Sequence, residues 1–187
     1  KGQIVALDDY RAVIGMTERS MGLSMNETDT SKLSKVADKL QTIKDNIAVY
    51  DSDSPKSSLI SGDCNVSYCW AAEIALAMEE NPAIKIVFPE EGAYKFIDNW
   101  AICKGAKNYD NAMKFINYMC DDKVAGKVIE EFPYLNVNQK AVEANEDYSK
   151  NEAKNIPSDV FEKGEFVSNL DTDTLKVYND MWNKLKN

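Results

Sequence analysis

The sequence contains no histidine. Histidine is the commonest general base and the commonest side-chain ligand of transition metals, so its absence removes the Ser–His and Cys–His nucleophile pairs and most zinc sites. The absence of histidine does not exclude catalysis by carboxylates alone. We nevertheless expect no catalytic residue, no cofactor and no metal site in this chain.

Cysteine pairs, long apolar runs and glycine-rich loops are also scarce. None of the four cysteines, at positions 64, 69, 103 and 120, forms the CxxC pair that zinc and redox sites use. Cys69, Cys103 and Cys120 lie inside apolar runs, so we expect them to be small buried hydrophobic residues. A single disulfide stays open if the protein is secreted. No apolar run approaches the roughly 20 residues that span a bilayer, and no phosphate-binding loop is present.

Basic residues are outnumbered. The chain has 22 Lys and Arg against 31 Asp and Glu, a net charge of -9, whereas nucleic-acid binding needs a basic face. We expect no nucleic-acid partner. The acidic balance is compatible with a cationic ligand, although solubility alone is the simpler explanation. Hydrophobic residues make up 44% of the 187 positions, enough for a sizeable core.

Short strand patterns alternate with helical patterns over the first half of the chain. Strands are predicted at 4–7, 47–50, 65–70 and 84–88, with helices at 11–21, 30–44, 55–61 and 71–80. Such alternation indicates an α/β layer with a mostly parallel sheet. From Tyr109 onward the pattern is mainly helical. The chain opens almost directly on a strand, and we expect a fragment or a processed chain.

The loops that follow the first three strands carry polar or aromatic residues, and ligands bind at the carboxyl ends of parallel strands. These residues are Asp9, Ser52 and Trp70. Further along, Phe96 and Asp98 place a ring beside a carboxylate. A ring face attracts a cation and a carboxylate accepts its N–H donors, so these residues predict a site for an organic cation.

Each of these residues also has a simpler role. Asp9 can cap a helix, Ser52 can serve a turn, and Trp70 and Phe96 can pack in a core. Asp98 is harder to explain in this way because it lies in an apolar segment. A buried, unpaired carboxylate costs too much, so Asp98 either faces solvent or is paired in a cleft.

Seven short motifs follow one another along the chain: Leu7–Val13, Tyr50–Pro55, Val66–Trp70, Val87–Gly92, Asp98–Ile102, Asn111–Met119 and Phe132–Tyr134. In this order they resemble the second half of the spermidine/putrescine-binding proteins of bacterial ABC importers. Each motif is weak alone, but the ordered set is fairly specific and covers essentially the whole chain.

The resemblance implies a periplasmic-binding-protein fold of type II, in which two lobes close over a ligand. This α/β lobe would have a central mixed, mostly parallel sheet flanked by helices, and a helical C-terminal part. Residues 1–97 would form the C-terminal lobe and residues 98–142 a crossover that belongs to the N-terminal lobe. Residues 143–187 would return to the C-terminal lobe, and the N-terminal lobe itself would be missing.

The resemblance also implies roles for six residues. Trp70 and Phe96 resemble the aromatic walls around the methylene chain of the polyamine. Asp98 resembles the carboxylate that binds an amine near the middle of the ligand, and Asp9 an acidic residue near a terminal amine. Further cleft contacts are implied for Ser52 and Tyr134.

Two positions depart from the family pattern. Ala12 stands where the family often has Glu, and Val167 stands where the family has a polar side chain near the end of the site. Both differences remove a polar contact, and they modestly favour a different ligand in the same fold.

The expected function is that of an extracytoplasmic solute-binding component of an ABC importer, periplasmic or anchored at the cell surface. Its expected partners are a polyamine or related cation, the membrane permease and the missing lobe, and the isolated lobe is expected to self-associate. Two alternatives stay open. The same fold can bind an amino-acid derivative, a sugar or a metal chelate, or, less in keeping with the sequence, the chain is an enzyme that uses a carboxylate pair.

Overall fold

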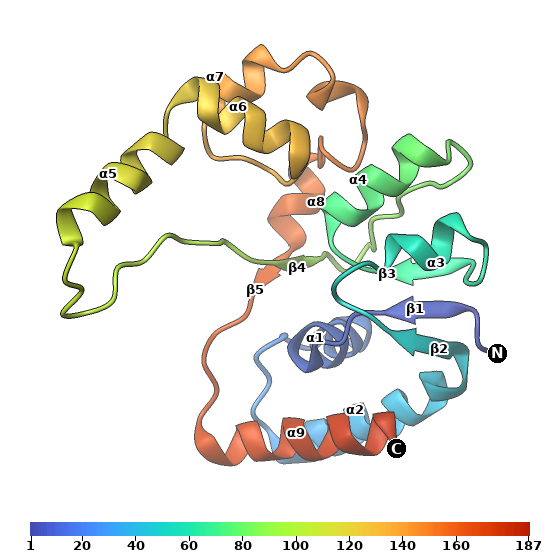
Figure 1. Cartoon of the computed structure of the whole chain (residues 1–187). Coiled ribbons are helices and arrows are strands. Elements are labelled where there is room, and N and C mark those ends of the chain that lie inside the picture. The colour runs from blue at the N-terminus through green and yellow to red at the C-terminus, as the bar shows by residue number, and fades with distance from the viewer. The chain divides into compact units, whose positions relative to one another are not determined.

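The computed structural model describes residues 1–187, leaving aside the side chain of Ser149. The chain divides into two compact units. The first unit combines Lys1–Phe96 with Ile156–Asn187, and the second unit is Ile97–Asn155. Figure 1 labels their elements. The first unit is therefore discontinuous in sequence.

A three-stranded parallel sheet lies at the centre of the first unit. Strand β1 (Ile4–Ala6) pairs on one side with β2 (Ile47–Tyr50) and on the other with β3 (Val66–Tyr68). In this register Ala6 lies opposite both Tyr50 and Tyr68. The mixed α/β architecture and the parallel sheet confirm the predicted fold class.

The first unit carries six α-helices in the described structure. The apolar face of α2 buries Leu33, Val36 and Leu40, as its helical spacing predicts. The bounds are α1 (Tyr10–Ser20), α2 (Thr30–Ile43), α3 (Lys56–Ile60), α4 (Ala71–Glu80), α8 (Ser158–Lys163) and α9 (Thr172–Lys186), with a 3-10 turn η1 (Lys44–Asn46) after α2.

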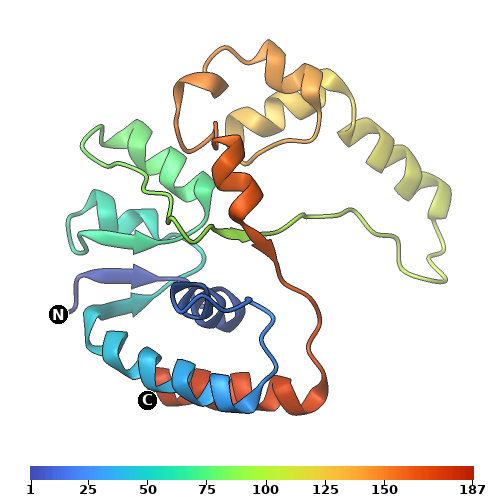
Figure 2. The same ribbon diagram turned by 180° about the vertical axis from the view of Figure 1, so that it is seen from behind.

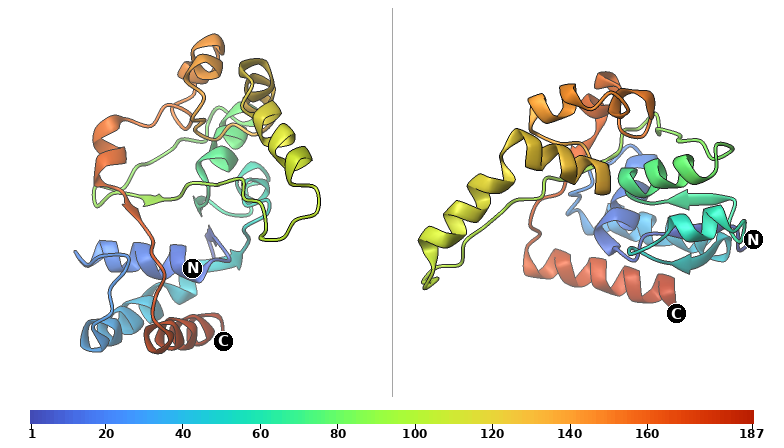
Figure 3. Two further views of the ribbon diagram at one scale, coloured as in Figure 1. Left: turned by 90° about the vertical axis from the view of Figure 1, so that its left-hand side faces the viewer. Right: turned by 45° about the horizontal axis from the view of Figure 1, so that its top comes forward.

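The main hydrophobic core lies where α1, α2 and α9 pack together beside the sheet. Helices α2 and α9 lie next to each other in every view (Figures 1, 2 and 3). The fully or almost fully buried members of this core are Ala6, Val13, Ile14, Leu33, Val36, Leu40, Tyr178, Met181 and Leu185. The last three lie on α9, so the final helix of the chain completes a core that the first 50 residues begin.

A second parallel sheet joins the two segments that flank the second unit in sequence. It consists of β4 (Tyr94–Lys95) and β5 (Glu165–Phe166), with Tyr94 opposite Glu165. Gly92, just before β4, has φ of 90° and lies so close to the Lys163 carbonyl that a Cβ would collide with it. Only glycine suits this position.

The strand predicted at 84–88 is wrong, because this segment pairs with no strand in the described structure. Its alternation is nevertheless real: Ile84, Ile86 and Phe88 are half-buried, while Lys85 and Val87 are exposed. One side of an extended segment can pack against the fold without a hydrogen-bonded neighbour. The apolar pattern alone therefore did not distinguish a strand from an extended loop.

The second unit is small and helical. It consists of α5 (Tyr109–Met119), α6 (Asp122–Glu131), α7 (Gln139–Ala144) and the 3-10 turn η2 (Tyr148–Lys150). Its core is limited to Ala125, Ile129, Ala141 and Tyr148, with Val142 packed against them. Helix α5 buries none of its described residues, and aromatic side chains such as Phe132 (65% exposed) lie on the surface.

A carboxylic acid is buried inside the first unit. Glu18 of α1 is fully buried and accepts a hydrogen bond from the hydroxyl of Tyr178, which also donates to the Glu27 carbonyl at 3.1 Å. Burial raises the pKa of Glu18 to about 7, and the Tyr178 hydrogen bond and the Arg11 charge offset only part of that effect. The second carboxyl oxygen has no hydrogen-bond partner among the described residues.

Replacing Glu18 with glutamine should change how stability depends on pH. The folded-state pKa of Glu18 lies above its ordinary value of 4.5, so the folded protein holds a proton that the unfolded chain releases in this window. The wild-type free energy of unfolding therefore falls relative to that of Glu18→Gln as pH rises from about 4.5 to about 7, by up to about 3 kcal/mol.

Urea unfolding at several pH values measures this difference, with the substitution Glu80→Gln at an exposed position of α4 as the control. If the wild-type and Glu18→Gln stabilities ran parallel across the window, Glu18 would not be the buried acid described above.

Candidate ligand-binding site

Three of the predicted site residues lie at one edge of the central sheet. Asp9, Ser52 and Trp70 follow the carboxyl ends of β1, β2 and β3, and the parallel register brings those ends side by side. The sequence predicted this arrangement because each residue lies at the end of a strand pattern or within two residues of it.

Asp9 is the N-cap of α1. Its Oδ1 accepts hydrogen bonds from the backbone N–H groups of Arg11, at 2.8 Å, and Ala12, at 3.1 Å. Asp9 therefore caps the helix, which is the simpler role considered for it, and capping uses only one carboxylate oxygen. The side chain is half-buried, and the other oxygen makes no hydrogen bond among those described, so it is an acceptor for an added donor.

The hydroxyl of Ser52 has an unmet hydrogen-bonding capacity. Its Oγ is buried, yet it has no partner within the described residues. Leaving a buried hydroxyl unpaired costs about 1–3 kcal/mol. A ligand atom or a water molecule that reaches Ser52 would remove this cost.

Trp70 and Phe96 lie in contact. Their ring centroids are 5.2 Å apart with the planes at 66°, an edge-to-face pair rather than two parallel walls. Phe96 is 40% exposed and follows β4. That the two rings flank a methylene chain remains a prediction.

Tyr94 is a member of this cluster that the sequence reasoning missed. Its ring stacks on that of Phe96, with centroids 6.0 Å apart and planes at 26°, and also lies 5.9 Å from the Trp70 ring. The missed signal is the spacing, because residues at i and i+2 of an extended segment face the same side.

Asp98 and Tyr134 belong to the second unit. Asp98 is exposed, in agreement with one of the two situations expected for it. Tyr134 is half-buried, and its carbonyl accepts a hydrogen bond from the Tyr148 hydroxyl at 3.3 Å. Their part in a site shared with the first unit remains a prediction.

The two departures from the family pattern lie in the first unit. Ala12 is fully buried in α1. Val167 lines a surface hollow of about 280 Å³, together with Tyr10, Arg11, Ser168, Asn169, Leu170 and Leu175. The single charged side chain in this lining is a cation, Arg11, so the hollow contains no carboxylate for an ammonium group.

Metal and disulfide chemistry find little support in the described side chains. No cluster of three or more His, Cys, Asp or Glu side chains capable of holding a metal ion occurs among them. All four cysteines are free thiols, and burial raises the pKa of Cys69 to about 11. Of the three cysteines expected to be buried, Cys69 is half-buried, but Cys103 and Cys120 are exposed, because the second unit has too small a core to cover the apolar runs around them; Cys64 is buried.

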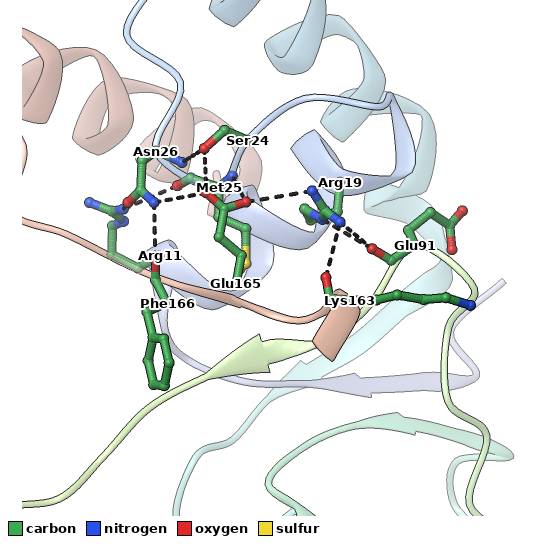
Figure 4. Close-up of polar contacts among 9 residues, drawn as sticks. All are labelled: Arg11, Arg19, Ser24, Met25, Asn26, Glu91, Lys163, Glu165 and Phe166. Atoms are coloured by element: carbon green, nitrogen blue, oxygen red, sulfur yellow. Dashed lines mark hydrogen bonds and ion pairs between the residues drawn. The ribbon is translucent and has the colours of Figure 1, made fainter. Parts of the chain in front are cut away.

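Arg19 of α1 holds both segments that flank the second unit in sequence. Its guanidinium donates to the carbonyls of Glu91 and Lys163, the latter at 3.3 Å, and its Nη1 lies 3.5 Å from Oε2 of Glu165 (Figure 4). Glu91 precedes β4 and Lys163 precedes β5. The helix that begins at Asp9 therefore also fixes the small sheet that leads to Phe96.

The Glu165 carboxylate beside Arg19 accepts several hydrogen bonds. It accepts hydrogen bonds from the Ser24 hydroxyl, the Met25 backbone N–H at 3.0 Å and the Asn26 side chain at 3.1 Å (Figure 4). Burial alone would raise the pKa of Glu165, but these hydrogen bonds and the Arg19 charge outweigh it and lower the pKa.

Comparison with known proteins shows the family to which the chain belongs. Residues 3–156 match the model of the bacterial extracellular solute-binding proteins. A spermidine/putrescine-binding periplasmic protein of Salmonella typhimurium is 28% identical over 187 residues, which are 100% of this chain and 53% of that protein. The chain thus spans about half the length of the curated relatives it matches.

Solved structures show the same similarity. A putative spermidine/putrescine ABC transporter protein from Listeria monocytogenes has 32% identity and a TM-score of 0.91, over 100% of this chain and 58% of that one. A spermidine/putrescine transporter substrate-binding protein from Streptococcus pneumoniae has 27% identity and a TM-score of 0.84, with the same coverage. Within the described chain, no helix has both the length and the apolar character that crossing a bilayer requires.

Replacing Glu165 with glutamine should destabilise the first unit by about 2 kcal/mol at neutral pH, because hydrogen bonds to a charged acceptor are lost and an amide N–H₂ faces existing donors. The lowered pKa means that the charged form stabilises the fold above its ordinary pKa of 4.5 and that this contribution is lost as pH falls. The difference in free energy of unfolding between wild type and variant should therefore shrink in acid.

Chemical denaturation measures this difference, with Glu162→Gln at an exposed position as the matched control. Equal losses of stability in both variants would contradict the hydrogen-bond network around Glu165.

Proposed function

Because this chain belongs to the bacterial extracellular solute-binding protein family, we propose that it binds a small solute, and that this solute is a polyamine such as spermidine or putrescine. The observation that carries the proposal is the similarity to spermidine/putrescine-binding proteins over 100% of the chain. The groups at the strand ends are those that such a ligand needs: a ring cluster for methylenes and acceptors for ammonium groups.

In this proposal the protein performs no chemistry. Two lobes close over the ligand, and release delivers it to the membrane permease of an ABC importer on the outer side of the cytoplasmic membrane. Trp70 and Phe96 contact the methylene chain, Asp9 and Asp98 contact ammonium groups, and Ser52 and Tyr134 add polar contacts.

We further propose that residues 98–142 belong with the lobe that this chain lacks, and that residues 1–97 and 143–187 form the C-terminal lobe. The small core of the second unit and the exposed α5 support this division. An amphipathic helix with no buried residue gains stability only when another surface covers it.

A different small solute in the same fold is the second candidate. Ala12 and Val167 favour it, because Ala12 adds no carboxylate and the hollow beside Val167 has a cationic lining residue, Arg11. An enzyme that uses a carboxylate pair would need two carboxyl groups about 5–10 Å apart across a pocket, and the solute-binding family gives no support for one.

Isothermal titration of the full-length protein with putrescine and spermidine tests the proposal. We expect saturable binding of at least one of them, and we expect Asp98→Asn to weaken it by about 2–5 kcal/mol, because a desolvated charge pair loses one member. Asp38→Asn, on the exposed face of α2, is the control for the loss of a charge.

No heat of binding and no thermal shift with either amine would reject polyamines as ligands, and a screen of amino acids and sugars would then test the second candidate. Unchanged affinity in Asp98→Asn would remove Asp98 from the site.

The 187-residue chain on its own should self-associate, because apolar side chains such as Trp100 (62% exposed) and Val137 (96% exposed) lack a covering surface. Light scattering should show an average mass that rises with protein concentration. Addition of the missing half, if it folds separately, should reverse the association; a strictly monomeric mass at all concentrations would contradict the prediction.

A further inference from the structure

The ammonium group of Lys186, near the end of α9, is enclosed by a carboxylate and two aromatic rings. Its Nζ lies 2.6 Å from Oδ1 of Asp8, 5.4 Å from the centre of the Tyr50 ring and 5.3 Å from the centre of the Trp182 ring. A carboxylate combined with two ring faces is a set of groups that recognises an alkylammonium ion.

These groups are held by the fold rather than by the lysine. Asp8 follows β1, Tyr50 ends β2, and Trp182 lies on α9. The Tyr50 and Trp182 rings contact each other edge to face, with centroids 5.2 Å apart, and both pack against the main hydrophobic core. A site whose walls are already fixed binds without a large ordering cost.

The enclosure is open to solvent. The Lys186 side chain is 37% exposed and that of Asp8 is 45% exposed. An ammonium ion from solution can therefore reach the carboxylate once the lysine is absent.

We infer that Asp8, Tyr50 and Trp182 form a second binding site for a primary alkylammonium group, which the chain's own Lys186 fills. The site shares no residue with the proposed polyamine site. Because the lysine is tethered beside it, its effective concentration is of order millimolar or higher, and free amines compete poorly. Lys186 thus keeps the protein from binding a second amine at the edge of its sheet.

Lys186→Ala opens the site, and n-propylammonium chloride is the matching probe, because it replaces the three carbons and the nitrogen that the substitution removes. Thermal unfolding of the 187-residue chain measures binding. We expect a saturable rise in Tm of about 2–4 °C in Lys186→Ala and a much smaller rise in the wild type. Equal concentrations of n-propanol and of sodium chloride, which lack the alkylammonium group, should not reproduce the rise.

Two variants separate this site from general effects of salt or charge. Lys184→Ala removes an exposed lysine from the same helix and should respond to n-propylammonium like the wild type. Asp8→Asn combined with Lys186→Ala should lose the rise. Equal responses in Lys186→Ala and Lys184→Ala, or a rise that survives Asp8→Asn, would overturn the inference.

A measurement on the unmodified chain covers the case in which Lys186→Ala does not fold. Two rings beside the ammonium should shift the proton resonances of the Lys186 ε-methylene group upfield from those of an exposed lysine. Resonances at the positions of a solvated lysine would overturn the inference. Neither test involves a residue of the proposed polyamine site. Either test can therefore fail while the proposed function stands, and both can succeed while the proposed function fails.

Discussion

Pairing of β1 on both of its sides is the constraint on which the first unit depends. The strand has only three residues, and its Val5 and Ala6 are buried. Because both neighbours run parallel to it, the three following loops meet at one edge. The positions of Asp9, Ser52 and Trp70 therefore follow from strand register.

The first unit also depends on the segment that returns to it after residue 155. This segment supplies α9, which contributes Tyr178, Met181 and Leu185 to the core, and β5, which pairs with β4. Glu165 reaches back to the loop between α1 and α2. Without the return segment, the apolar faces of α1 and α2 that pack against α9 would be exposed to solvent. The first unit therefore needs both of its sequence segments.

The parts of the fold with local signals were predictable from sequence. Helix α1 begins after an Asp cap and has amphipathic spacing, as predicted, and β2 and α4 have the predicted bounds. The two-residue strand β5 was not predicted, since so short a strand has no periodicity and its partner lies far away in the chain. The strand at 84–88 failed for the opposite reason, because its alternation is present without a paired neighbour.

The candidate site likewise has features that could be predicted from the sequence and features that could not. The strand-end positions of Asp9, Ser52 and Trp70 could be predicted, because each lies at the end of a strand pattern or within two residues of it. The edge-to-face contact of Trp70 with Phe96 and the enclosure of Lys186 could not, since they join segments whose proximity depends on tertiary packing. Tyr134 rests on the family resemblance alone, whereas Asp98 was also predicted from the ring and carboxylate at positions 96 and 98.

The neighbouring carboxylates Asp8 and Asp9 show how packing assigns different roles to identical side chains. Asp9 uses one oxygen to cap α1, where the positive end of the helix dipole favours its charge, and the other oxygen is left as an acceptor. The ammonium of Lys186 neutralises Asp8 at 2.6 Å. Two adjacent negative charges would otherwise repel each other at the end of β1. The pairing of Asp8 with Lys186 therefore reduces the repulsion between the two neighbouring carboxylates at the end of β1.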